Sequence, residues 1–85
     1  MIAVEKAVKI ADSCRSFAPS GCSVTFTYDC SLNASTASTE VAAFYITLRS
    51  GDKSVTRRVD SSLMRPKVIK GLIASTYRWL KNNES

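Results

Sequence analysis

Residues 22–30 alternate strictly between apolar and polar side chains, and no other segment restricts the fold of this chain as strongly. Successive side chains of an extended strand point to opposite faces, so a period of two gives one apolar face and one polar face. Most of these positions hold β-branched or aromatic residues, which favour strands. The apolar face comprises Cys22, Val24, Phe26, Tyr28 and Cys30, and the polar face comprises Ser23, Thr25, Thr27 and Asp29.

Two further strands are predicted at residues 41–49 and 54–59. The polar segment of small residues at 31–39 is predicted to be a loop, and its length is typical of mobile or contact-making loops. Residues 50–53 fit a tight hairpin turn between the second and third strands. The inward-facing residues of the second strand are predicted to be Ala42, Phe44, Ile46 and Leu48.

The hairpin turn also predicts the pairing of the second and third strands. With Gly51 and Asp52 at the centre of the turn, Leu48 lies opposite Val55, and Phe44 lies opposite Val59 by the same register. That register places Arg57 on the inner side of the sheet, so we expect this residue at the sheet rim or beside a bulge. The outer face then carries Tyr45, Thr47, Thr56 and Arg58.

Amphipathic helices are predicted before and after the strands, at residues 3–17 and 62–82. Ser61 or Ser62 can cap the second helix, and Pro66 fits its opening turn, where a missing N–H does little harm. The apolar stripe of the first helix is Ala3, Ala7, Ile10, Cys14 and Phe17. The apolar stripe of the second helix is Ile69, Leu72, Ile73, Thr76 and Leu80.

Together these elements predict an α+β fold in a single domain, residues 1–85, with a three-stranded antiparallel sheet. Both helices pack on one face of the sheet, in the order α-β-β-β-α, and the other face is open to solvent or a partner. A chain of 85 residues buries only about 60% of its unfolded surface. We therefore expect a homodimer, because association would support so small a core.

The composition argues against catalysis and metal binding. The chain has no His, its acidic residues are scattered, and it shows no nucleophile-elbow or phosphate-loop pattern, so we expect no enzyme and no cofactor. Cys14, Cys22 and Cys30 are spaced too widely for a zinc site. They are predicted to be buried free thiols, with a redox role as the alternative. No apolar run approaches the roughly 18 residues of a membrane span, so a cytoplasmic protein is expected.

Positive charge is concentrated in the last part of the chain. Nine of the twelve Lys and Arg residues lie between Arg49 and Lys81, where the only acidic residues are Asp52 and Asp60. A one-sided positive charge attracts polyanions, and Arg suits phosphate because its planar fork donates two hydrogen bonds at once. The predicted nucleic-acid-binding residues are Arg49, Lys53, Arg57, Arg58, Arg65, Lys67, Lys70, Arg78 and Lys81.

Other interpretations of these residues remain open. The basic side of the second helix, residues 67–81, is about 21 Å long at 1.5 Å per residue, but it could equally be a solvated face that keeps the protein soluble. The arginines near the hairpin could protect an edge strand from pairing with other chains. Trp79 lies on the flank of the second helix, where it could finish the core, contact a second subunit or stack on a base. Tyr45 has the same alternatives.

The element order resembles that of the double-stranded-RNA-binding domain, over almost the whole chain. In that family a lysine-rich cluster at the start of the second helix grips phosphates across a groove. Arg65, Lys67 and Lys70 stand nearest to that position here, although the tightly spaced lysine motif and the His-containing loop are absent. The resemblance implies RNA as the main partner, with DNA less favoured.

In size and charge the chain is also similar to small phage-encoded inhibitors of host defence, of the anti-CRISPR or toxin-inhibitor type. That similarity implies an alternative function, in which the protein binds and blocks a host nuclease or other RNA-handling enzyme, together with RNA or without it.

Overall fold

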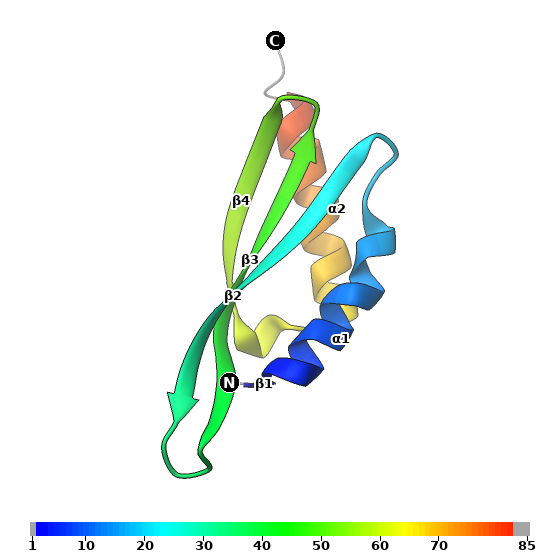
Figure 1. The fold of residues 1–85 in the computed structure, drawn as a ribbon. Helices are drawn as coiled ribbons and strands as arrows, with labels where there is room; N and C mark the ends of the chain where they lie inside the picture. Colours follow the sequence, from blue (N-terminus) through cyan, green and yellow to red (C-terminus); the bar gives the residue numbers. More distant parts are fainter. Residues whose placement is uncertain (1, 83–85) are drawn as a thin grey trace.

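The computed structural model describes residues 2–82. Figure 1 shows the chain as two helices and a long, strongly twisted sheet. In chain order the elements are β1 (Ile2–Ala3), α1 (Val4–Cys14), a 3₁₀ turn (Arg15–Phe17), β2 (Cys22–Asn33), β3 (Ser38–Ser50), β4 (Lys53–Asp60), a second 3₁₀ turn (Ser61–Leu63) and α2 (Pro66–Asn82).

The predicted α+β class and antiparallel sheet are confirmed, but the sheet has four strands rather than three. The additional strand, β1, pairs with β3 through Ile2 opposite Val41. The element order is therefore β-α-β-β-β-α. A strand of two residues shows no alternation, so the periodicity of the sequence could not reveal it.

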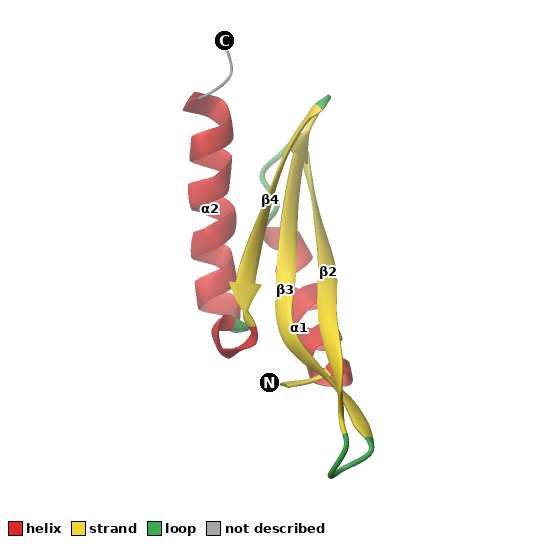
Figure 2. Ribbon diagram, turned by 90° about the vertical axis from the view of Figure 1, so that its left-hand side faces the viewer, coloured by secondary structure: helices red, strands yellow, loops and turns green. Residues whose placement is uncertain are grey.

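β3 is the central strand of the sheet. β2 pairs along one side of β3, while β4 and the short β1 follow one another along the other side. Figure 2 shows both helices on the same face of the sheet, with α2 alongside β4. The opposite sheet face has no covering element among residues 2–82, so β4 presents both an open face and an unpaired edge.

The core lies between this sheet and the two helices. β3 contributes Phe44, Ile46 and Leu48, each no more than 1% exposed. The fully buried residues of α1 are small, so this helix approaches the sheet closely. The core side chains of the helices are Ala7, Ala11 and Cys14 of α1 and Ile69, Ile73 and Leu80 of α2, together with the buried Thr76.

A β-bulge changes which residues of β3 face the core. Asp29 of β2 pairs with Ala43, but the next residue, Cys30, pairs with Val41, so Ala42 is the extra residue. The prediction that Ala42 faces inward is wrong in consequence, and Val41 is the buried residue. The prediction of three buried thiols is also wrong, because Cys30 is exposed and only Cys14 is fully buried.

The predicted loop at residues 31–39 is mostly strand. β2 continues to Asn33 and β3 begins at Ser38, which leaves only residues 34–37 as the turn. The Asn33 carboxamide oxygen accepts hydrogen bonds from the backbone N–H and the hydroxyl of Ser35, at 3.1 and 2.9 Å. The result is a two-stranded arm that extends beyond both helices at the lower end of Figure 1.

Both helices are shorter than predicted. The first becomes a 3₁₀ turn after Cys14, and the second begins at Pro66 rather than near residue 62. The segment before Pro66 is the second 3₁₀ turn, where the Asp60 carboxylate accepts a hydrogen bond from the Ser62 N–H at 2.9 Å. This 3₁₀ turn ends before Met64, whose φ of −75° and ψ of 71° lie outside the helical region. The next residue, Arg65, precedes Pro66, and a residue before proline is disfavoured in the α region.

Candidate nucleic-acid interface

The outer side of α2 carries a line of basic side chains, which we call the α2 stripe. Its members are Lys67, Lys70, Arg78 and Lys81, all exposed. Lys67 and Lys70 are three residues apart, as are Arg78 and Lys81, and eight residues separate Lys70 from Arg78. By the helical period all four lie opposite the stripe that enters the core, so their charges point away from the sheet. Over its length of about 21 Å, the stripe displays one sign of charge.

Carboxylates do not neutralise most of the α2 stripe. Among residues 2–82, the ion pairs are Arg15 with Asp12 at 3.4 Å and Arg58 with Asp29 at 3.6 Å. Within the described chain, neither Lys67 nor Arg78 has an acidic partner. Their charges are therefore available to an external anion.

Two aromatic rings help to position the stripe. The Lys70 ammonium lies 5.6 Å from the centre of the Phe17 ring, and the Lys81 ammonium lies 5.6 Å from the centre of the Tyr77 ring. Both distances fall within the range of cation–π attraction. The Phe17 contact joins α2 to the 3₁₀ turn after α1, so Lys70 has a structural role as well as a charge.

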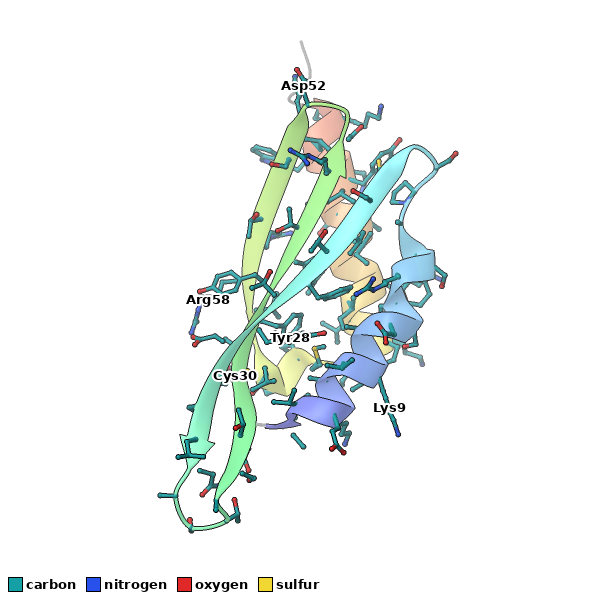
Figure 3. The ribbon with its side chains drawn as sticks, viewed as in Figure 1. Lys9, Tyr28, Cys30, Asp52 and Arg58 are labelled. Atoms are coloured by element: carbon teal, nitrogen blue, oxygen red, sulfur yellow. The ribbon has the colours of Figure 1, made fainter. Side chains whose placement is uncertain are left out.

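The remaining predicted basic residues do not lie together on the α2 side. Arg58, labelled in Figure 3, lies on the open face of the sheet. Its ion pair with Asp29 joins β4 to β2 across β3, where Asp29 lies opposite Ala43 and Arg58 lies opposite Tyr45. Arg49 is exposed on that face as well, since it pairs in register with Ser54. Lys53 follows the hairpin turn, and Arg65 precedes α2. The structure thus divides the nine residues between the helix, the sheet face and the turns.

Arg57 links β4 to α2, at the sheet rim where the hairpin register predicts it. Its Nη1 atom donates hydrogen bonds to the hydroxyl oxygens of Ser75 and Thr76, at 3.2 and 3.3 Å. The Thr76 hydroxyl donates in turn to the carbonyl oxygen of Leu72 at 2.7 Å. These bonds fix one nitrogen of the guanidinium group against the helix.

Beside Arg57 a groove runs between β4 and α2. Its volume is about 340 Å³, and its lining residues are Val55, Arg57, Ser75, Thr76 and Trp79. Trp79 is 55% exposed, so the interpretation that it finishes the core is wrong. The sequence contains one indication of this groove. The predicted register puts Arg57 on the inner side of an edge strand, where its charge cannot enter an apolar core.

Two titratable groups in the described chain have a raised pKa, and neither belongs to a metal-binding cluster there. Residues 2–82 contain no group of three or more His, Cys, Asp or Glu side chains that could hold a metal ion. Burial raises the pKa of the Cys14 thiol, and burial is also the main cause of the raised pKa of the Tyr28 hydroxyl beside α1. In the same range, no helix is long and apolar enough to cross a membrane.

Comparison of this chain with protein-family models, with curated proteins and with solved structures gives no match. The resemblance to the double-stranded-RNA-binding domain is thus one of predicted element order alone, and the observed order adds β1 before α1.

Proposed function

We propose that this protein is a small, non-catalytic RNA-binding module that regulates or inhibits its target, and that the α2 stripe contacts the phosphate backbone. The observation that supports the proposal is an exposed helix face with charges of one sign, on which Lys67 and Arg78 have no carboxylate partner within residues 2–82. A face that served solubility alone would ordinarily mix acidic and basic residues.

Binding of this kind depends on phosphate contact rather than on base recognition. Each phosphate that a lysine or arginine neutralises releases condensed counterions, so affinity falls steeply as salt rises. Phosphate contacts position a protein on the nucleic acid but carry no sequence information. We therefore expect weak sequence preference. RNA is proposed ahead of DNA because of the resemblance in element order.

The test compares two variants that each lose three positive charges. In the first, Lys67, Arg78 and Lys81 of the α2 stripe are changed to Gln. In the second, called the α1 variant, Lys6 and Lys9 of α1 and Arg15 of the following 3₁₀ turn are changed to Gln. All three are exposed, and Lys9 points away from the sheet in Figure 3. Lys70 is left in place because it also packs on Phe17.

We expect the α2 variant to lose RNA affinity at low salt and the α1 variant to retain most of it. An equal loss in both variants would mean that only net charge matters, and full affinity in the α2 variant would show the stripe to be a solvated surface. Circular dichroism of both variants checks that the fold is intact.

A second candidate function is inhibition of a host RNA-handling enzyme through the open sheet face. The observation in its favour is an uncovered sheet face whose side chains contact one another. The Thr47 and Thr56 hydroxyl oxygens lie 2.9 Å apart, and Arg58 forms an ion pair with Asp29. A pull-down from host lysate treated with nuclease separates the two functions. A single protein that stays bound after RNA removal supports the inhibitor, whereas recovery of RNA alone supports the module.

The predicted homodimer belongs to the same proposal, since two copies would double the basic surface. Sedimentation at micromolar concentration decides it, and a single species of the monomer mass, 9.3 kDa, would contradict it.

A further inference from the structure

The groove between β4 and α2 combines an aromatic wall with a fixed cation. Val55 and Arg57 are alternate residues of β4 and therefore point to the same side of the strand. Ser75 and Trp79 lie one turn apart on the flank of α2. The two elements thus bring one apolar side chain (Val55), two hydroxyl groups (Ser75 and Thr76), a guanidinium group (Arg57) and an indole ring (Trp79) into one space of about 340 Å³. That volume is within the range of small-molecule sites.

Arg57 is oriented before any ligand arrives. Its Nη1 atom is already bonded to Ser75 and Thr76, but its Nε and Nη2 atoms have no partner within residues 2–82. These atoms are hydrogen-bond donors in a rigid planar fork, which matches the oxygens of a phosphate. Because the side chain is already held, less conformational entropy is lost when it binds an anion.

Trp79 offers a planar surface next to that cation. Trp79 is about half exposed, and none of the residues within 2–82 that line the groove is acidic. Further positive charge lies close by, because Arg78 precedes Trp79 and Lys53 lies on the same side of β4 as Val55. A ligand that complements the groove is therefore both flat and anionic, and a nucleotide has both properties in one unit.

We propose that the groove binds one unpaired nucleotide of RNA, with its base stacked on Trp79 and a neighbouring phosphate on Arg57. The inference rests on the proposed RNA binding and deepens it, because it predicts a preference for single strands, ends or bulges over uninterrupted duplex. A base held inside a duplex has no free face for the indole, whereas an unpaired base can turn outward and stack.

The fluorescence of Trp79 tests the stacking directly, because Trp79 is the only tryptophan of the chain. The probes are a short single-stranded oligouridylate and a blunt RNA duplex of the same length, both titrated into the full chain at low salt. Stacking predicts that the single strand quenches the indole fluorescence to saturation. A duplex that quenches equally would overturn the preference for unpaired bases.

Affinity measurements with labelled RNA then separate stacking from charge. Trp79→Ala should weaken single-strand binding by about 5- to 150-fold, the usual range for the loss of one base–aromatic stack, and Trp79→Phe should restore part of the loss. Arg57→Lys keeps the charge but removes the planar fork, so it should bind more weakly than the wild type. Lys9→Gln is the control for loss of one charge elsewhere on the surface.

An oligonucleotide with abasic positions completes the test, because it retains the phosphates and lacks the bases. The wild type should bind it as weakly as Trp79→Ala binds the intact strand, and Trp79→Ala should not distinguish the two strands. If Trp79→Ala binds RNA normally while the α2 variant does not, the groove proposal fails and the RNA-binding function stands.

Two further outcomes would also overturn the groove proposal. If no variant or wild-type protein binds RNA, the proposed function fails together with it. If Trp79→Ala leaves RNA affinity unchanged but converts a dimer to a monomer in sedimentation, the groove is a contact between subunits.

Discussion

The change of glycine to alanine should have opposite effects on stability at two positions of this chain, Gly71 and Gly51. Gly71 lies in the middle of α2, is exposed, and has no heavy atom within 4 Å of the position that a Cβ would occupy. Alanine restricts the unfolded chain more than glycine does and is the best helix former. Gly71→Ala should therefore raise the free energy of unfolding by about 0.5–1 kcal/mol.

Gly51 is equally free of steric neighbours, yet the same substitution should be harmful there. Its φ of +65° places it in the first central position of the two-residue turn between β3 and β4. An L-residue in that left-handed region costs about 1–2 kcal/mol, while glycine adopts it freely. Gly51→Ala should therefore lower the free energy of unfolding by that amount.

Urea and thermal unfolding, followed by circular dichroism, measure both effects. For a domain of this size, 1 kcal/mol corresponds to a shift in Tm of about 4–8 °C. The two variants should thus move in opposite directions from the wild type. A Gly71→Ala variant that is less stable than the wild type would refute the exposed helical position of Gly71, and a neutral Gly51→Ala would refute the turn.

Three further predictions concern the core, the thiols and the start of the second 3₁₀ turn. Phe44→Ala should lower the free energy of unfolding in urea by about 3–5 kcal/mol because Phe44 is completely buried, whereas Leu32→Ala, at a residue of the arm that is 71% exposed, should change it by less than about 0.5 kcal/mol. Similar losses of stability in the two variants would contradict the position of the core. Under native conditions a maleimide should label the exposed Cys30 quickly and the buried Cys14 only on unfolding, as mass spectrometry of labelled peptides would show, and rapid labelling of Cys14 would contradict its burial. Hydrogen bonds from Ser62 lower the pKa of Asp60, so this carboxylate stabilises the fold above its unfolded pKa of about 4 and loses that contribution as pH falls through the lower folded value. Asp60→Asn should reduce this loss of stability at acid pH, and a pH profile of stability unchanged from the wild type would show that the bond contributes nothing.

The sequence predicted the elements with strong periodicity. The register of β3 and β4 is confirmed, because the turn at Gly51 determines which residues lie opposite one another. The buried stripe of α2 is likewise confirmed at Ile69, Ile73 and Leu80. Alternation and helical period report directly on which side chains face the core.

Features that depend on tertiary context were missed. Nothing in the alternation of residues 41–49 distinguishes Ala42 as a bulge residue, because alanine fits either face of a strand. The arm at residues 31–39 has polar, small side chains that resemble a loop, but cross-strand pairing extends both strands through it. Intrinsic strand propensity is weak compared with pairing to a neighbour.

The candidate site was predicted in part for the same reasons. The α2 stripe follows from helical period alone, so its exposed basic residues are where the sequence placed them. The groove depends on the packing of α2 against β4, and the sequence could not show that Arg57 and Trp79 line one space. Nor could it show that Arg58 is paired with Asp29 across the sheet.

The dependence of RNA affinity on salt tests the central claim most directly. If the four cations of the α2 stripe each neutralise one phosphate, the slope of log affinity against log salt should be about −2.8 for a single strand and about −3.6 for a duplex. Affinity should then fall by about 50- to 150-fold between 50 and 200 mM salt, in proportion to those slopes. The variant that lacks Lys67, Arg78 and Lys81 should have a slope on single-stranded RNA that is shallower than that of the wild type by about 2.1. A slope equal to that of the wild type would contradict phosphate binding by this helix.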